Sequence, residues 1–495
     1  MTRGLATAAV ACVAALTLAA CSSGDSSGDV SDAGGEVTTT TLAPNQYFNG
    51  PVVEAAPNPL GLKWSWKNFA TFQQQVISVA GGTTFYEVDW CEMEPTRGSV
   101  TYDDTDEIVE AAQRLGYEIY LKLRVGSCWA TGSTNVETQG APKVPSEMPL
   151  DLDAYAAWVT ETVRHYSARD VHTYAIENEV NTKNQWAPGA ADYATLLARG
   201  AAAVRAGDPS AKVADSGLAS IGYGTVLAAD QLAAGDGAGA VATYSAFYAR
   251  RIKKSGSGGR FVAVGSVPEL SKELADDDAV RNRSFFDVTV AAAAAKQIDV
   301  WQLHYYEPEA ELAQVVAWVR QKAPAQAIGG WELGVAWPGD DYDPAQHAVE
   351  TTQLFAGALA LGVQPDIYLP EAFSPDARDN EIWRGLWEPS GTPRLAASAF
   401  TQLAHATSGD GNTFAQISTP ALTGLAVGKG DKSTLVVWSA SGQPSTLTLA
   451  GSLEGATASD IDGRPLPPGA AVTVGASPVY LDAAVAAAQA VAALG

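Results

Sequence analysis

From residue 60 onward, short β-prone runs alternate along the chain with longer segments in which apolar residues recur at helical spacing. Eight such runs occur, at residues 61–66, 85–90, 118–126, 173–179, 212–217, 300–306, 327–334 and 366–373. Strands that alternate with helices are typical of βαβ units, because a helix then returns the chain to the start of a parallel neighbour. The pattern therefore predicts eight parallel strands joined by helical crossovers.

Repetition of this unit favours a (β/α)8 barrel over residues 50–408. An open doubly wound sheet is the alternative, but no Gly-rich phosphate fingerprint follows the first run. The helical segments at residues 103–116 and 151–168 both begin with acidic residues. We expect Asp side chains to cap these helices and Gly116 to end the first of them.

The hydrophobic pattern changes in two later regions. Residues 218–299, between the fifth and sixth predicted strands, are too long for an ordinary connection and predict a subdomain at the rim of the barrel mouth. A surface elaboration without a role at the mouth is the alternative. Alternating apolar positions and turns then predict a small antiparallel β-sandwich over residues 409–483. A loose helical Ala-rich tail, residues 484–495, is predicted to follow, and we assign no function to it.

The N-terminus has the layout of an export signal over residues 1–20, since Arg3 precedes an apolar run too short to span a bilayer. The run ends at Leu18-Ala19-Ala20-Cys21, which resembles the lipobox of bacterial lipoproteins. That resemblance implies cleavage before Cys21, lipidation of its thiol, and a protein anchored at the outer face of the bacterial membrane. An ordinary signal peptide is the alternative. Residues 21–49 hold few apolar residues before the barrel and predict a flexible tether.

Charge and cysteine content narrow the possible partners. The net charge of -24 repels phosphate backbones, so no nucleic-acid partner is expected. After Cys12 and Cys21 only Cys91 and Cys128 remain, and export to an oxidising compartment predicts a disulfide between them. The 5 His residues show no metal-ligand spacing. We expect neither a metal nor a cofactor, and we expect a monomer.

Polar and aromatic residues gather toward the C-terminal ends of the predicted strands: Trp66, Asp89, Arg124, Glu179, Asp215, His304, Tyr306, Glu332 and Glu371. In a barrel these ends meet on one face, where active sites are built. The fourth run, in the stretch HTYAIENEVN, ends with two carboxylates that flank an amide. Carboxylates are costly in a core, so their position predicts a strand that opens onto the barrel mouth.

The Asn178-Glu179 pair resembles the Asn-Glu motif that ends the fourth strand in clan A, the retaining (β/α)8 glycoside hydrolases. The resemblance implies that Glu179 is the general acid/base and that Asn178 binds the 2-hydroxyl of the sugar. Glu332, in the stretch IGGWELG, resembles the nucleophile segment of the seventh strand. Retention requires two carboxyl groups about 5 to 5.5 Å apart, and strands four and seven face each other across a barrel.

Two further segments resemble the same clan. QLHYYEP resembles its His-x-Tyr segment, which implies that His304 lies at the sugar and that Tyr306 hydrogen-bonds Glu332. GLWEPSGTPRLAASAF, residues 385–400, resembles the closing segment, and Trp387 and Trp66 are predicted to stack on sugar rings. His304 as a core histidine and the two tryptophans as core residues are the alternatives.

Two positions depart from the motif of the clan. Glu177 stands where an aromatic or aliphatic residue is usual, and Val180 replaces a frequent Pro. Glu177 could bind a sugar hydroxyl or pair with a base such as Arg124, and we predict the second. We also predict that Arg124 and Glu371 form an ion pair at the rim rather than act as ligands.

Together these features predict a glycosidase that hydrolyses O-glycosyl bonds of a glycan with retention. The acidic chain favours neutral or cationic sugars. A glycan-binding surface lipoprotein without catalysis and a transglycosidase on the same fold are the alternatives.

Overall fold

The computed structural model describes residues 43–133, 144–253, 261–338, 342–369, 382–383, 385–388 and 390–494. From Asn45 onward the chain forms one compact unit. The predicted signal peptide, Cys21, most of the predicted tether and Glu371 lie outside the described residues. The predictions made for them stay predictions.

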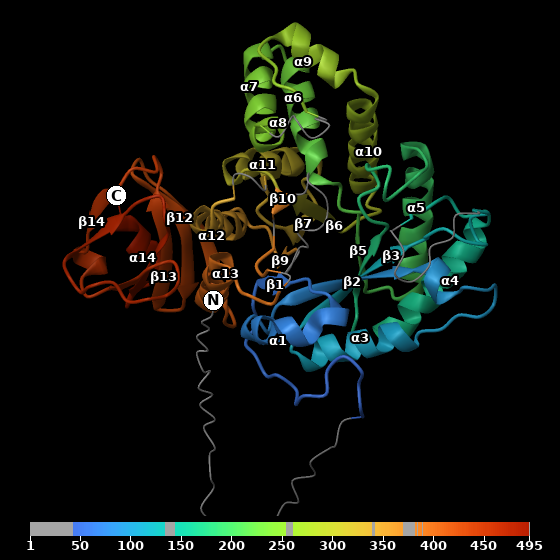
Figure 1. Cartoon of the computed structure of the whole chain (residues 1–495), viewed down its shortest axis with the longest axis horizontal. Helices are drawn as coiled ribbons and strands as arrows, with labels where there is room; N and C mark the ends of the chain where they lie inside the picture. The colour runs from blue at the N-terminus through green and yellow to red at the C-terminus, as the bar shows by residue number, and fades with distance from the viewer. Residues whose placement is uncertain are drawn as a thin grey trace, which may run out of the picture. The chain divides into compact units, whose positions relative to one another are not determined.

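Among the described residues, eight parallel strands form a nearly closed barrel in the order β1-β9-β7-β6-β5-β4-β3-β2, which confirms the predicted fold class (Figure 1). Their bounds are β1 Leu60–Leu62, β2 Thr83–Asp89, β3 Glu118–Arg124, β4 Thr173–Ile176, β5 Lys212–Ala214, β6 Val300–Tyr305, β7 Ala327–Leu333 and β9 Asp366–Tyr368. The β4 and β5 strands are buried throughout or nearly so, as expected of strands covered on both faces.

A helix that packs outside the barrel follows each strand in this part of the chain, and after β5 it comes at the end of the insertion. These helices are α1 Phe69–Ser78, α3 Asp103–Arg114, α4 Leu152–Ser167, α5 Ala190–Gly207, α10 Asp277–Ala294, α11 Leu312–Lys322, α12 Pro344–Ala360 and α13 Leu395–Thr407. Asp151 caps α4 as predicted, because its carboxylate accepts from the backbone N–H groups of Asp153 and Ala154. The capping prediction for α3 is wrong, since Tyr102 holds the cap position and Asp103 is already helical.

The barrel closes where β1 meets β2, and glycine makes this seam possible. A side-chain carbon on Gly61 would lie 1.8 Å from the carbonyl oxygen of Thr83, and one on Gly82 would lie 2.0 Å from that of Leu60. The two backbones therefore approach more closely than any other residue type would permit.

The predicted insertion is helical. It begins with η2 Ser220–Gly222 and continues through α6 Tyr223–Ala233, α7 Gly237–Phe247, α8 Ala249–Lys253 and α9 Val267–Leu274 into α10. Helices α6 to α9 form the green group at the top of Figure 1. Helix α10 packs against both α5 and α6, so it connects this group to the barrel and leads back to β6.

The C-terminal region is an antiparallel β domain, as predicted. Its main sheet has the order β11-β12-β13-β17-β15, and β14 pairs with β16. The bounds are β11 Thr413–Ser418, β12 Leu422–Lys429, β13 Lys432–Ser439, β14 Ser445–Thr448, β15 Thr457–Ser459, β16 Ala471–Val474 and β17 Val479–Ala483. The predicted loose tail is a short helix, α14 Ala487–Ala492, which packs on β12 and β13 and buries Ala490 completely. It is part of the core of this domain because its small side chains allow close packing.

Smaller elements lie near the barrel mouth. They are η1 Trp66–Asn68, α2 Trp90–Met93, η4 Glu309–Glu311 and the two-stranded pair β8 Trp337–Pro338 and β10 Ile382–Trp383. The predicted disulfide is confirmed: Cys91 in α2 is bonded to Cys128, which follows β3, with the Cα atoms 5.6 Å apart. None of the described helices is both long enough and apolar enough to cross a membrane.

Candidate active site

The backbone at the end of β4 leaves the extended conformation earlier than predicted. The strand ends at Ile176, and Glu177 and Glu179 adopt positive φ angles of 67° and 41°. Positive φ is uncommon for non-Gly residues and is often found at functional sites. Hydrogen bonds from the N–H of Glu177 to Leu123 O and from that of Glu179 to Ser216 O, both 3.0 Å, hold this turn between the neighbouring strands.

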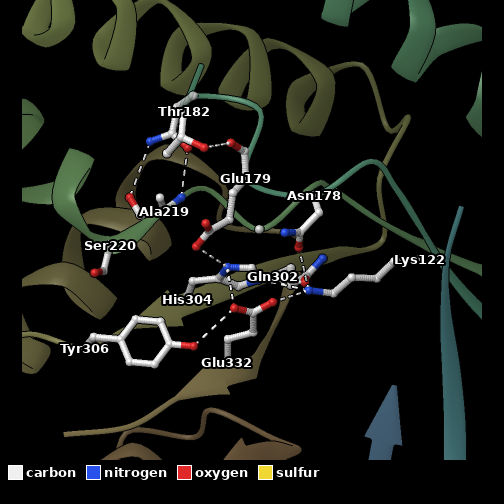
Figure 2. Close-up of polar contacts among 12 residues, drawn as sticks. Lys122, Asn178, Glu179, Thr182, Ala219, Ser220, Gln302, His304, Tyr306 and Glu332 are labelled. Atoms are coloured by element: carbon white, nitrogen blue, oxygen red, sulfur yellow. Dashed lines mark hydrogen bonds and ion pairs between the residues drawn. The ribbon is translucent and has the colours of Figure 1, made fainter. Parts of the chain in front are cut away.

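Glu179 and Glu332 come together at the barrel mouth (Figure 2). His304 lies between them, and its Nδ1 is 3.1 Å from Oε1 of Glu179 and 3.3 Å from Oε2 of Glu332. One oxygen of each carboxylate and a ring nitrogen of His304 all lie within 4.8 Å of one another. Carboxylate oxygens this close fit the separation of about 5 to 5.5 Å between the carboxyl groups of retaining glycosidases better than the separation of about 6.5 to 9.5 Å in inverting enzymes.

Two donors, Lys122 and Tyr306, and the ring of His304 surround the carboxylate of Glu332, whose side chain is only 8% exposed. Oε1 accepts from Nζ of Lys122 at 2.5 Å, and the hydrogen bond predicted from the Tyr306 hydroxyl is present, to Oε2 at 3.1 Å. Burial alone would raise the pKa of Glu332, but the charges of His304 and Lys122 and the Lys122 hydrogen bond outweigh it and lower that pKa. The surroundings therefore favour an ionised Glu332.

The orientation of His304 is fixed from its other side. Gln302 donates from its amide nitrogen to the carbonyl of Asp215 at 2.7 Å, which turns its Oε1 toward Nε2 of His304 at 2.8 Å. An acceptor at that distance requires a proton on Nε2. The register of β6 on β7 shifts between Gln302 and His304 and sets His304 directly beside Glu332.

Gly217 allows this arrangement because it passes directly over the ring of His304. Its φ is +63°, and a side-chain carbon there would lie 2.1 Å from Nε2 of His304. Only glycine satisfies both conditions.

Asn178 lies beside the pair, as the resemblance implied. Its Oδ1 accepts from Nζ of Lys122 at 2.8 Å, so its NH₂ group is oriented away from Lys122 and has the chemistry to donate to a sugar hydroxyl.

Glu177 contacts Arg124, as predicted, with Oε2 3.8 Å from Nε of the guanidinium. Burial raises the pKa of Glu177 to about 7, although Arg124 and the N–H of Val125 act in the opposite direction. Arg124 also contacts Glu87 at 3.4 Å and Asp89 at 3.2 Å. Arg124 therefore balances three carboxylates, of which Asp89 and Glu177 are buried.

The two predicted tryptophans have different surroundings. Trp66 is half-buried and lines a cavity of about 470 Å³, together with Trp64, Tyr86 and Glu87 among others. This cavity lies at the ends of β1 and β2, and neither Glu179 nor Glu332 lines it. Its aromatic wall keeps the sugar-stacking prediction for Trp66 open.

Trp387 has the surroundings of a core residue, which was the alternative to sugar stacking. Its ring is 8% exposed and packs edge-on against Phe72 of α1. Its indole N–H donates to Gln75 of the same helix at 3.3 Å, and Gln75 in turn contacts α13. The ring therefore belongs to the helical layer outside the barrel.

The sequence analysis missed Lys122 and Gln302, which organise the carboxylate pair. Lys122 is completely buried, and in β3 it stands two positions before Arg124 on the face that points into the barrel. The available signal was a lysine inside a mostly apolar strand. It stands two positions before Arg124 and therefore points to the same face of β3.

The same three side chains, Glu179, His304 and Glu332, have atoms spaced as metal ligands could be. However, the ammonium of Lys122 lies 2.5 Å from Glu332, so a cation would meet charge repulsion here. The donor set suits proton transfer better than metal binding.

Hydrogen bonds also join the turn that follows β4, which carries Glu179, to the insertion between β5 and β6 (Figure 2). Thr182 donates from its N–H to Glu179 O at 2.8 Å. The side chain of Asn181 accepts from the N–H of Ala219 at 2.9 Å and donates to Oδ1 of Asn282, on α10, at 2.8 Å. The residues that follow Glu179 are thus held by the segment between β5 and β6.

Neither a protein-family model nor a curated protein matches the sequence. Several solved structures resemble the fold. A family 39 glycoside hydrolase from Bacteroides cellulosilyticus WH2 aligns with a TM-score of 0.56 at 16% identity, over 88% of this chain and 82% of that one.

Two structures of β-xylosidases from Caulobacter crescentus are also similar. One, described as a family 39 enzyme, has a TM-score of 0.52 at 15% identity over 88% of this chain and 98% of that one. The other, described as monomeric and from strain CB15, has a TM-score of 0.51 at 14% identity over 87% and 97%. At this level of identity the likeness is one of fold. The chain therefore has the (β/α)8 barrel fold found in clan A glycoside hydrolases.

Proposed function

We propose that this protein is a retaining glycoside hydrolase that acts on a glycan or oligosaccharide by double displacement. The observation that carries the proposal is the pair Glu179 and Glu332, at the ends of β4 and β7, whose oxygens lie within 4.8 Å across His304. A receptor would not need two carboxylates at this spacing, whereas retention does.

In the first step, Glu332 attacks the anomeric carbon while Glu179 protonates the oxygen of the leaving group. A glycosyl ester of Glu332 results. In the second step Glu179, now ionised, takes a proton from water as the water attacks the same carbon and releases Glu332. Asn178 is positioned to donate to the sugar 2-hydroxyl, and no cofactor takes part.

For the substrate, we propose a neutral or cationic sugar in β-linkage. The net charge of -24 disfavours polyanions, and two of the similar structures are described as β-xylosidases. Aryl β-xylosides are therefore the first compounds to test, followed by other aryl β-glycosides and plant polysaccharides. Transglycosylation, the transfer of the glycosyl group to a sugar acceptor, uses the same chemistry. Products longer than the substrate would reveal it.

The test compares the wild type with Glu179→Ala and Glu332→Ala. We expect both variants to lose at least about a thousandfold in kcat on unactivated substrates. Azide should restore turnover to both variants, with an inverted glycosyl azide from Glu332→Ala and a retained one from Glu179→Ala, because azide enters on opposite faces of the sugar. A wild type that releases no product but binds the same glycan as both variants would instead establish the receptor.

We further propose that the protein is exported and held at the membrane by a lipid on Cys21. The lipobox resemblance supports this proposal, and so does the disulfide between Cys91 and Cys128, which suits an oxidising compartment.

A further inference from the structure

Lys122 occupies an unusual position for a lysine. It lies in the middle of β3 with no exposed side-chain surface, and its ammonium reaches the centre of the candidate active site. Burying a charge of this kind is costly unless partners compensate for it. The contacts of Lys122 therefore indicate what the charge does.

Four groups lie close to the ammonium of Lys122. It donates to Oε1 of Glu332 at 2.5 Å and to Oδ1 of Asn178 at 2.8 Å, and the ring centroid of Phe85 lies 4.0 Å away. Nε2 of His304, at 3.3 Å, carries the proton that Gln302 requires and so is not an acceptor. With its donors engaged in this way, Lys122 acts on the carboxylate rather than on the sugar.

The two oxygens of Glu332 are held differently. Oε1 contacts a full positive charge at 2.5 Å, whereas Oε2 accepts from the neutral hydroxyl of Tyr306 at 3.1 Å and lies 3.3 Å from His304. A charged donor withdraws more electron density than a neutral one. Lys122 therefore holds Oε1 more strongly than the Tyr306 hydroxyl holds Oε2, and Oε2 faces the nitrogen that bridges to Glu179.

We propose that Lys122 is a positioning residue that holds Oε1 of Glu332, directs Oε2 toward the anomeric carbon, and stabilises the carboxylate when it leaves the sugar. This inference rests on the proposed function. In the first step the bond from Oε2 to the anomeric carbon forms, the bond to the leaving oxygen breaks, and the proton of Glu179 passes to that oxygen. In the second step water bonds to the same carbon, its proton passes to Glu179, and the electron pair of the broken bond returns to Glu332 beside Lys122.

The test uses Lys122→Met, which keeps the length of the side chain and removes the charge. Lys212→Met, at the exposed start of β5, is the matched control. We expect Lys122→Met to lower kcat about 100-fold. We also expect the acidic limb of kcat/KM to move to higher pH by about 1 to 3 units, because Glu332 would lose its nearest cation. A purely structural role would lower activity without moving this limb.

Burst kinetics with a dinitrophenyl glycoside test the second step. We expect Lys122→Met, but not Lys212→Met, to accumulate the glycosyl-enzyme, because its departing carboxylate lacks the stabilising charge. Lys122→Arg should restore part of the rate and move the limb back, since it keeps the charge. An unshifted limb in a folded Lys122→Met would overturn the inference.

A titration that needs no turnover separates this inference from the proposed function. The carboxylate band of Glu332 can be isolated as the infrared difference between each protein and the same protein with Glu332→Gln. If the wild type hydrolyses no glycoside but the band titrates at higher pH without Lys122, the effect on Glu332 stands and the proposed function fails. If the enzyme is active and the band does not shift, the inference fails. Should Lys122→Met not fold, Lys122→Gln serves in both measurements.

Discussion

Trp66 and Trp387, for which the sequence predicts the same role, have different surroundings in the structure. Trp66 lines a cavity beside the mouth, whereas Trp387 packs against Phe72 in the outer helical layer. We expect Trp66→Ala to raise KM roughly 3- to 10-fold, the strength of an aromatic contact, and to lower the free energy of unfolding by about 1 to 3 kcal/mol, because the ring also packs against Tyr47, Trp64 and Phe69. Trp387→Ala should lower the free energy of unfolding by about 3 to 5 kcal/mol and leave the KM of the folded enzyme unchanged.

Steady-state kinetics and thermal unfolding of the two variants check this prediction. An increase in KM for Trp387→Ala with normal stability would show that the ring reaches substrate after all.

Gly217 gives a second test at the scale of single residues. A methyl group there would meet Nε2 of His304 at 2.1 Å. We expect Gly217→Ala to lower kcat about 100-fold, because displacement of His304 by even 1 Å disturbs both carboxylates. Gly235→Ala is the control, since Gly235 also has positive φ, +88°, but has nothing within 4 Å of the added carbon. Equal losses of activity in both variants would mean that backbone strain, not His304, is responsible.

The residues brought together at the mouth were predictable only in part. Glu179, Glu332, His304 and Tyr306 end strands, and the ends of parallel strands must meet, so their proximity followed from the strand count. Lys122 and Gln302 lie within strands, where only the direction of each side chain reveals the neighbours. The surroundings of Trp387 were hidden for a similar reason: its position in the sequence did not reveal that the ring faces α1.

At the scale of elements, α12 and β9 share a buried histidine. His347 lies between the hydroxyls of Tyr342 at 3.2 Å and Tyr368 at 3.0 Å. Burial, with help from Arg394 and Arg250, lowers its pKa to about 3. Because the unfolded chain binds a proton near pH 6.5 and the folded one does not, this residue favours folding above that pH and opposes it progressively down to about pH 3.

We therefore expect the wild type to lose on the order of 4 kcal/mol through His347 between pH 7 and pH 3. The loss should be absent from His347→Gln, whose own stability at pH 7 is lower because a buried contact is disturbed. Chemical denaturation of both proteins across this range measures the difference. Parallel curves for the two proteins would contradict the prediction.

Element positions were predicted better than element ends. The strand runs were recognisable because their apolar residues are covered on both faces of the sheet. The end of β4 was placed three residues too late, since the sequence does not reveal that Glu177 and Glu179 adopt positive φ. The Ala-rich tail was misjudged because alanine contributes little hydrophobic signal, yet α14 completes the core of the β domain.

At the scale of the whole molecule, membrane attachment through Cys21 remains a prediction. We expect the wild type to partition with membranes when expressed in a bacterium and its N-terminal peptide to carry a mass consistent with acylated cysteine. Cys21→Ala should abolish both, whereas Cys12→Ala, within the predicted signal, should change neither. Release of the wild type in soluble form with an unmodified N-terminus would identify an ordinary signal peptide instead.

The hydrogen bonds that join Asn181 to Ala219 and Asn282 bear on how this barrel can be recombined with others. Loop exchange between barrels usually assumes that each loop is an independent unit. Here the peptide after Glu179 is held by Asn282, 101 positions beyond Asn181, so transplanting either segment alone would leave buried amide groups without partners. The smallest portable block runs from the start of β4 to the end of α10, and a chimera that respects those borders should keep its acid/base in place.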